Sequence, residues 1–477
     1  MKKHTLIGVV VSMALVLVAS AVVLVGLGRA PLWDYDEASY AQITHGMLAH
    51  QAWISQQYFH GPFLEKPPLY AWLAAGSARM FGETEFALRL PSALAAVALV
   101  AATIALTFVL TESVLAAVFA GCVLLGLSPL FEAARQVRID VLVTLWITLA
   151  AWAAGQGVRK KRYFLLYGIL LGCAVLTKGV IAFFALAALP LLLWWYGALR
   201  LLRTREVWGG MALALLIALP WHIIEFVTYG KRFWQDYVVF NITSRVRSDL
   251  FELAPTSNRD YIWYLAHFAL PWTQVLALSV VPLLVWWREV PARMRAAIGF
   301  GLSMVTLVLC VFFASATKAP TYLMPLYPFA ALVLGSMFAV VYARVRGGVR
   351  VIFWALGGLL FVLGVGATVY NSHHLNTRYF GVADALAQEE YAIAPYVAQH
   401  TEGRWLVFGG YRELGAIMYY AHRYDPEDLT STSTLQVGDL VLMYQAKHSA
   451  FFGQYPVSTV ALFDGEQLTL LEVVSED

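Results

Sequence analysis

Long apolar runs fill most of this sequence, and they constrain its fold more than any single motif does. Of its 477 residues, 60% are hydrophobic and 13% are charged. A helix needs about twenty consecutive apolar residues to cross the hydrocarbon core of a bilayer. We therefore expect an all-α polytopic membrane protein. Runs of this kind predict eleven transmembrane helices, near residues 5–28, 91–111, 114–131, 139–157, 163–176, 179–198, 207–225, 262–287, 297–316, 322–342 and 351–370.

Lys and Arg are concentrated in every second short loop between these runs. Cytoplasmic loops of membrane proteins carry an excess of these residues, so the loops concerned and the N-terminus are expected inside. With eleven spans, the C-terminus and the long loops at 30–90 and 226–261 are then expected on the outer face. The first run is longer than the apolar region of most signal peptides, and we expect it to be retained. The basic segments are 2–3, 159–162, 200–205, 288–295 and 344–350.

The segment after residue 370 has a different character. An amphipathic stretch, VADALAQEEYAIAPYVAQH, is followed by runs typical of strands, such as RWLVFGG and GDLVLMYQ. This alternation predicts a small soluble α/β domain at 371–477, outside a transmembrane domain at 1–370. Nothing in the segment resembles a phosphate-binding glycine loop or a catalytic triad.

A second group of charged residues lies at the expected outer helix ends and in the outer loops, although its members come from separate parts of the chain. A charge at the edge of the membrane is costly unless it is paired or functional, so these residues are candidates for one site. The group consists of Asp36, Glu37, Glu65, Lys66, Arg138, Asp140, Lys178, Arg245 and Lys318, with Tyr322 near the last of them.

The mixed charge of this group indicates group transfer. Cations with a tyrosine suit a phosphate or pyrophosphate, which they can stabilise as a leaving group. Separate carboxylates suit a general base or a ligand for a divalent metal ion. Prolines in EKPPLY and TKAPTYLMPLYP restrict the backbone around Glu65, Lys66 and Lys318. The net charge of +3 is small and spread over many loops, so no nucleic-acid partner is expected.

Five motifs occur in order along residues 30–330: LWDYDEASYAQI, FLEKPPLYAWLAAGSARMFGETEFALRLPSAL, VRIDVLVTLWITLA, LTKG and SATKAPTYLMPLYP. In this combination the sequence resembles integral-membrane glycosyltransferases of the GT-C type, in the branch of aminoarabinose transferase and of bacterial enzymes similar to protein mannosyltransferases. The resemblance implies a polyprenyl phosphate-linked sugar donor and inversion at the anomeric carbon. It also implies a lipid A-like or other cell-envelope acceptor and a place in the bacterial inner membrane.

The resemblance assigns roles to the acidic residues. Asp36 matches the acidic residue of the family's first outer loop and is the expected catalytic base, with Glu37 beside it to cap or orient the following helix. Asp140 matches the second acidic residue of the family. Glu65 matches a carboxylate that binds a metal in this branch, so a divalent metal ion is the one cofactor implied.

The resemblance also assigns the donor phosphate to basic residues and a tyrosine. Lys66 and Tyr322 match the family's phosphate-contacting lysine and tyrosine, and either Arg245 or Arg247 matches its loop arginine. The expected phosphate-binding set is Lys66, Arg138, Lys178, Arg245, Lys318 and Tyr322.

Two positions depart from the family pattern, and two other functions stay open. Ser39 stands where the family often has Arg, and Asn241 stands where the aminoarabinose branch has a His that shares the metal with the Glu. The alternatives are a transporter or flippase for a lipid-linked anionic glycan, and a polysaccharide ligase or polymerase. Transporters usually contain internal repeats and helices broken near the midplane, whereas this sequence shows no repeat and gathers its charges at one face.

Overall fold

The chain folds as two compact units. The computed structural model describes residues 2–32, 36–58, 61–244, 257–378, 381–400, 404–408, 415–421, 426–429, 435–455 and 457–476. Unit 1 comprises Met1–Leu27, Leu64–Ala74 and Arg89–Ser372, and unit 2 comprises Gly28–Phe63, Ala75–Leu88 and His373–Asp477.

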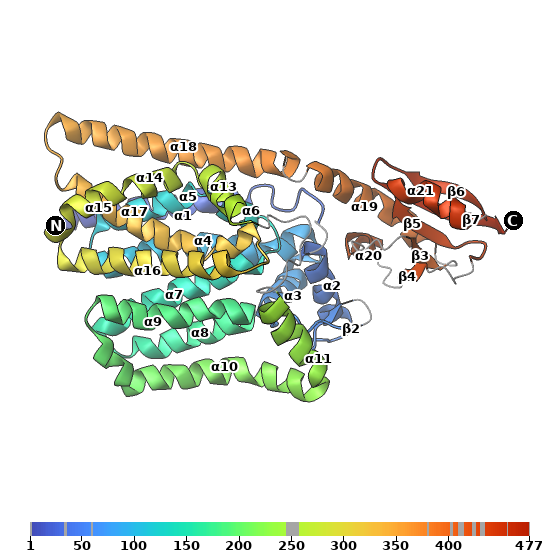
Figure 1. Cartoon of the computed structure of the whole chain (residues 1–477), viewed down its shortest axis with the longest axis horizontal. Helices are drawn as coiled ribbons and strands as arrows, with labels where there is room; N and C mark the ends of the chain where they lie inside the picture. The colour runs from blue at the N-terminus through green and yellow to red at the C-terminus, as the bar shows by residue number, and fades with distance from the viewer. Residues whose placement is uncertain are drawn as a thin grey trace. The chain divides into compact units, whose positions relative to one another are not determined.

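Unit 1 is a bundle of helices, most of which run side by side (Figure 1). The longer ones are α1 (Lys2–Leu24), α4 (Glu85–Thr111), α5 (Val114–Leu125), α7 (Ile139–Arg159), α8 (Tyr163–Lys178), α9 (Phe183–Trp195), α10 (Arg205–Tyr229), α16 (Ala292–Ala314), α17 (Leu326–Tyr342) and α18 (Gly348–Arg378). Shorter segments are α3 (Leu69–Phe81), α6 (Ser128–Ala134), η1 (Gly179–Ala182), η2 (Leu199–Arg203), α11 (Lys231–Phe233), the π-helix η3 (Trp234–Ser244), α13 (Asn258–Phe268), α14 (Trp272–Leu278), α15 (Val280–Trp286), η4 (Trp287–Glu289) and η5 (Pro320–Leu323).

The mostly helical, multi-span architecture is confirmed, but the predicted count of eleven spans is not. Within the described residues, seven helices are long and apolar enough to cross a membrane, or eight if the bent pair α5 and α6 forms one span. α8 and α9 count as one candidate of 33 residues, because η1 keeps the chain helical between them. The helix predicted at 262–287 is divided among α13, α14 and α15, with Pro271 at the first break.

Two glycines let α8 and α10 approach each other closely. A Cβ atom on Gly168 would overlap the carbonyl oxygen of Gly210, and a Cβ atom on Gly210 would overlap that of Phe164. Small residues at such points let helix backbones pack tightly inside a membrane. This contact fixes the position of α8, whose last residue is Lys178.

Replacing Gly168 with valine is expected to destabilise unit 1, because the added carbons have no room against α10. Overpacking of this kind costs about 1–3 kcal/mol. The melting temperature of the detergent-solubilised protein should therefore fall. Gly358→Val is the matched control, since no atom lies within 4 Å of the position of its Cβ in α18. Equal melting temperatures for the two variants would contradict the close contact.

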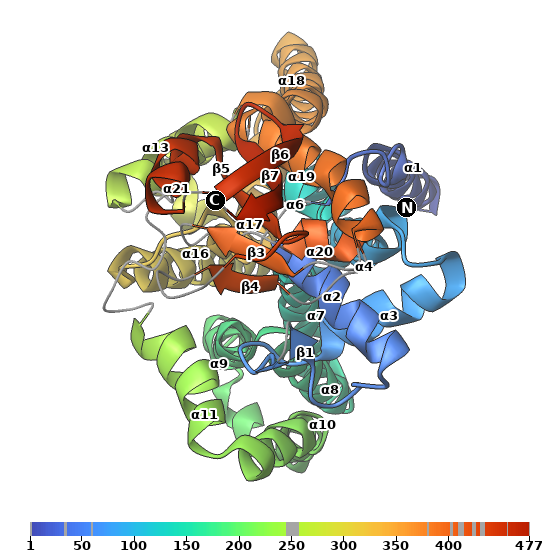
Figure 2. The same ribbon diagram turned by 90° about the vertical axis from the view of Figure 1, so that its right-hand side faces the viewer.

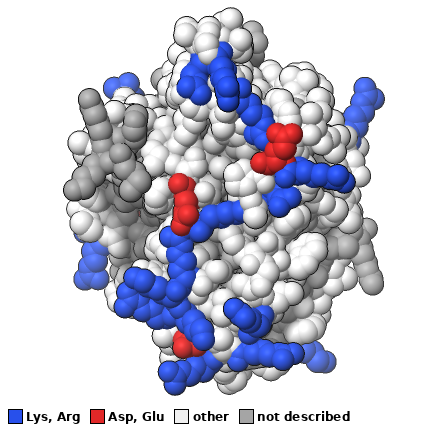
Figure 3. Space-filling model, turned by 90° about the vertical axis from the view of Figure 1, so that its left-hand side faces the viewer, with Lys and Arg blue, Asp and Glu red and all other residues white. Residues whose placement is uncertain are grey.

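The basic loops lie at one end of unit 1, where Lys and Arg side chains outnumber Asp and Glu on the surface (Figure 3). α7 ends at Arg159, and α10 begins at Arg205. The loop at Glu112 carries no Lys or Arg of its own, but its carboxylate lies 2.6 Å from Arg159 and 3.0 Å from Arg293. Because α7 runs from Ile139 to Arg159, its first turn lies at the opposite end of the bundle.

Unit 2 contains a five-stranded sheet built from the last part of the chain. The strand order is β4-β3-β5-β7-β6, in which β3 is parallel to β4 and β5, and the remaining pairs are antiparallel. The strands are β3 (Trp405–Phe408), β4 (Pro426–Leu429), β5 (Leu440–Tyr444), β6 (Val457–Asp464) and β7 (Leu468–Glu476).

Helices cover both faces of this sheet. α19 (Gly381–Gln399) and α20 (Gly415–Ala421) lie on one side, and α21 (His448–Gln454) lies on the other (Figure 2). Alternate strand residues enter the two cores: Trp405 packs with α19 and α20, and Leu406 packs with α21. The alternation is that of a strand with both faces buried.

The same unit includes part of the first loop. It contributes α2 (Asp36–Ala49), β1 (Gln57–Tyr58) and β2 (Gly61–Pro62). The hydroxyl of Tyr420 in α20 accepts a hydrogen bond from the backbone N–H of Leu32 and donates one to Glu85. The hydroxyl of Tyr419 donates to the carbonyl of Glu83. The loop segment and the C-terminal segment therefore fold together.

Candidate functional site

A carboxylate, an ammonium group and an aromatic ring meet at the end of unit 1 opposite the basic loops. Lys178 Nζ donates to Asp140 Oδ1 at 2.7 Å and lies 5.0 Å from the centre of the Tyr322 ring. The side chains of Asp140 and Lys178 are 9% and 14% exposed. A pair this buried has lost most of its hydration, so it is a candidate for function. The structure thus brings together three residues that the sequence predicts for one site.

The local structure explains where these three side chains lie. Asp140 is in the first turn of α7 and Lys178 is the last residue of α8, so each charge is at the helix end where the macrodipole favours it. Tyr322 belongs to η5, which begins at Pro320, and its ring lies 5.3 Å from that of Phe312 in α16. All three are therefore held by the ends of regular elements.

A second ammonium group, Lys66, is held by Asn241. Lys66 Nζ donates to Asn241 Oδ1 at 2.8 Å and lies 3.6 Å from Glu65 Oε2. Asn241 Nδ2 lies 2.9 Å from the backbone carbonyl oxygen of Glu65, 3.2 Å from that of Asp236 and 3.1 Å from that of Tyr237. The amide thereby ties the segment before the two prolines to the π-helix η3.

An apolar cluster connects the surroundings of the two lysines. Leu64 lies two residues before Lys66, and Leu176 lies two residues before Lys178. Both leucines are buried with Trp221 in one cluster, against which Leu69, Trp72 and Tyr237 pack. The same apolar cluster therefore holds the backbone segments that carry Lys66 and Lys178.

Tyr237 of η3 is itself fixed by hydrogen bonding and by close packing. His222 Nδ1 lies 2.8 Å from the carbonyl oxygen of Ala218, so this nitrogen carries the proton and Nε2 accepts from the Tyr237 hydroxyl at 2.9 Å. Burial raises the pKa of Tyr237, so the hydroxyl stays protonated. It occupies the space that a Cβ atom on Gly179 would fill. A side chain at position 179 would therefore have to displace the Tyr237 hydroxyl.

Lys318 and Arg138 belong to unit 1, but both bond to the protein close by in the sequence. Lys318 is buried and donates to the carbonyl oxygen of Ser315, and Arg138 Nε donates to Gln136 Oε1 at 3.0 Å. Their predicted roles at the donor phosphate stay predictions.

The expected base lies in unit 2. Asp36 is the first residue of α2 and is half-buried, whereas Glu37 is buried at 1% exposure. Of the two carboxylates, Asp36 is thus the one open to a substrate, and the burial of Glu37 suits a role in holding α2. Arg245 lies outside the described residues.

The residues around Glu65 do not fit the implied metal ion. In the described part of the chain, no group of three or more His, Cys, Asp or Glu is placed to hold one. Among the described residues, the Lys66 ammonium group lies 3.6 Å from the Glu65 carboxylate, and the Asn241 amide donates to the Glu65 backbone carbonyl. A cation beside the carboxylate opposes a second cation there, and an amide is a weaker ligand than imidazole. The predicted metal site at Glu65 is not confirmed.

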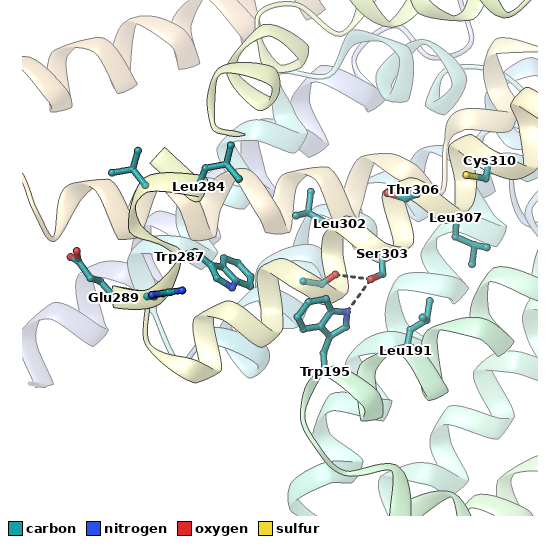
Figure 4. A pocket seen from close by; sticks show the side chains of 13 residues that line it. Leu191, Trp195, Leu284, Trp287, Glu289, Leu302, Ser303, Thr306, Leu307 and Cys310 are labelled. Carbon is teal, nitrogen blue, oxygen red and sulfur yellow. Dashed lines mark hydrogen bonds between the residues drawn. The ribbon is translucent and has the colours of Figure 1, made fainter. Parts of the chain in front are cut away.

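An apolar cavity of about 1140 Å³ lies along α9, α15 and α16 (Figure 4). The Trp195 indole donates to Ser303 Oγ at 2.9 Å across it. Most of the other lining residues are aliphatic or aromatic, and its charged residues are Arg288 and Glu289. Such a lining suits a hydrocarbon chain better than a sugar.

Tyr237 and His222, which support the site, could not be identified from sequence patterns. No motif contains them, and their roles depend on contacts with Gly179 and Ala218. Asn241 was noted only because it stands where the aminoarabinose transferase branch has a histidine.

Parts of this chain are similar to known protein sequences. Residues 65–224 match the family described as dolichyl-phosphate-mannose-protein mannosyltransferase. An undecaprenyl phosphate-alpha-4-amino-4-deoxy-L-arabinose arabinosyl transferase of Pseudomonas aeruginosa is 30% identical over 340 residues, which cover 65% of this chain and 56% of the relative. The Serratia proteamaculans protein of the same name is 26% identical, covering 73% and 62%. The chain thus spans little more than half the length of the first of these relatives.

Solved structures share the fold. The crystal structure of ArnT from Cupriavidus metallidurans bound to undecaprenyl phosphate has a TM-score of 0.73 at 19% identity, covering 96% of this chain and 97% of that one. The archaeal oligosaccharyltransferase AglB from Archaeoglobus fulgidus has a TM-score of 0.58 at 11% identity, covering 94% and 70%. At these identities the likeness concerns the fold.

Proposed function

We propose that the chain is an integral-membrane glycosyltransferase of the GT-C type, and that it transfers a sugar from a polyprenyl phosphate-linked donor to a lipid A-like or other cell-envelope acceptor, with inversion. The curated relatives are named as arabinosyl transferases of an undecaprenyl phosphate-linked sugar. Donors of that chemistry are the first to test.

The observation that carries this proposal is the buried pair of Asp140 and Lys178 beside Tyr322. The ammonium group is already desolvated and oriented, so little reorganisation is needed when a phosphate binds near it. Lys66 is likewise oriented, by its hydrogen bond to Asn241. The backbone segments before Lys66 and Lys178 pack in the same apolar cluster. Two fixed cations suit a phosphate that gains charge as it leaves.

In the proposed reaction, an acceptor oxygen attacks the anomeric carbon of the donor sugar. The bond between that carbon and the phosphate oxygen breaks, and the polyprenyl phosphate departs with the electron pair. Lys66, Lys178 and the hydroxyl of Tyr322 stabilise the leaving phosphate. The proton of the acceptor goes to a carboxylate, for which we propose Asp36. None of these steps uses a metal ion.

The distribution of charged residues supports a proposal for which end of unit 1 faces the cytoplasm. The basic end of unit 1 faces the cytoplasm under the positive-inside rule, and Asp140 and Lys178 are at the other ends of α7 and α8. The site then opens on the outer face of a bacterial inner membrane. We further propose that 1–370 is the transmembrane domain with eleven spans and that 371–477, with its five-stranded sheet, is an extracytoplasmic domain.

A transfer assay tests the proposed function. Purified protein in lipid nanodiscs is mixed with polyprenyl phosphate sugars carrying a radiolabel and with a panel of envelope lipids, and labelled product is separated from donor. We expect label to appear in a lipid acceptor together with one equivalent of free polyprenyl phosphate. Tight donor binding without transfer would instead favour the transporter alternative, and a product that grows by repeated addition would favour the polymerase.

A further inference from the structure

We infer that Asn241 is a positioning residue that holds Lys66 for the donor phosphate, in the place where the family resemblance implies a metal ion. This inference rests on the proposed function. It concerns the joint between the segment at 64–66 and the π-helix η3, which the amide of Asn241 closes through hydrogen bonds.

The hydrogen bonds of Asn241 use its amide in one orientation. Its oxygen faces the Lys66 ammonium group, which can only donate, and its nitrogen faces the carbonyl oxygens of Glu65, Asp236 and Tyr237, which can only accept. Turning the amide over would place donor against donor and oxygen against oxygen. A carboxylate or an imidazole cannot reproduce this pattern, so an asparagine suits the joint and a metal ligand does not.

Both sides of the joint are rigid. Lys66 is followed by Pro67 and Pro68, which restrict the backbone. On the other side, Tyr237 stacks on Phe233 with ring centres 5.1 Å apart. A lysine side chain is flexible and loses entropy when it is fixed, so a partner that fixes it beforehand increases its effect on a bound phosphate.

The π-helix also contacts the neighbourhood of the second lysine. Tyr237 and Asn241 are four residues apart on η3, and the Tyr237 hydroxyl packs on Gly179, next to Lys178. π-Helical turns often occur at functional sites. In this chain, η3 contacts the surroundings of both lysines through Asn241 and Tyr237, and neither contact requires a metal ion.

Two substitutions test the inference by donor affinity. Undecaprenyl phosphate binding to the full-length protein in nanodiscs is measured by native mass spectrometry, and the donor KM is measured where transfer is observed. Asn241→Ala is expected to raise the Kd about tenfold, because Lys66 is released. Asn241→Asp should also raise it, because its second carboxylate oxygen would face three carbonyl oxygens although the charge suits Lys66. The exposed Asn258→Ala is the matched control and should bind as the wild type does.

A double-mutant cycle separates positioning from a general loss of folding. If Asn241 acts through Lys66, Asn241→Ala should have no further effect on the Kd in a Lys66→Ala background. A chelator should leave the affinity of the wild type unchanged. The inference is overturned if Asn241→Ala binds normally, if the two effects add, or if a chelator abolishes binding and a divalent ion restores it. Since binding is read without transfer, a protein that binds the lipid yet transfers no sugar would refute the proposed function alone.

Discussion

Replacing Lys178 with methionine is expected to lower kcat/KM for sugar transfer by at least about a hundredfold, the effect typical of losing one fixed charge-stabilising group at a reacting centre. The ammonium group lies 2.7 Å from Asp140 and over the Tyr322 ring, and methionine keeps an unbranched apolar side chain of similar length without the charge. The measurement is steady-state transfer from a polyprenyl phosphate sugar. Lys160→Met is the matched control, because Lys160 is exposed in a basic loop.

The same substitution should also destabilise the protein, because it leaves the Asp140 carboxylate buried without its partner. Breaking a buried pair by removing one side costs about 3–5 kcal/mol, whereas replacing both sides by apolar groups is often neutral. We therefore expect Asp140→Leu combined with Lys178→Met to regain much of the lost melting temperature without regaining transfer. Full activity in the single or double variant would remove Lys178 from the site.

Asp36→Asn is expected to lower kcat by about 10²–10⁴-fold, the usual contribution of a general base, with little change in donor affinity. The amide occupies nearly the same volume at the start of α2 but cannot take the proton of the acceptor. Lys66→Ala should behave in the opposite way and weaken donor binding first. Single-turnover transfer and lipid binding, measured on the same preparations, separate the two effects.

Glu466→Gln provides the control for Asp36→Asn, because Glu466 is an exposed carboxylate in the same unit. Its transfer rate should equal that of the wild type. A normal rate in Asp36→Asn would mean that another group takes the proton. A loss of donor affinity without a loss of kcat would mean that Asp36 binds the donor and does not act as the base for the acceptor.

The candidate residues could be found from the sequence because charge is conspicuous in an apolar chain. Asp140 begins an apolar run and Lys178 interrupts another, and both entered the predicted site. Their pairing was not predictable, since 38 positions separate them and nothing local joins the two. Burial likewise separated Asp36 from Glu37, which are adjacent in the sequence and differ in exposure.

The number of membrane-spanning helices was harder to predict from the sequence than the candidate site residues. Hydropathy measures how much apolar chain is present, and it found apolar runs at 163–198 and at 262–287. It does not measure where a helix breaks or continues: the second run is broken near Pro271, whereas η1 joins α8 and α9 into one candidate span.

The sequence by itself therefore determined the membrane setting, the basic end of the helices and the kinds of residue available for a phosphate. These properties follow from the composition of short segments, because transfer into a bilayer depends on local polarity. Only the tertiary structure decided which charges meet. It paired Lys178 with Asp140, and it placed the amide of Asn241 between the ammonium group of Lys66 and the backbone carbonyl of Glu65. Such partners depend on atomic distances across the bundle, which the order of residues along the chain does not contain.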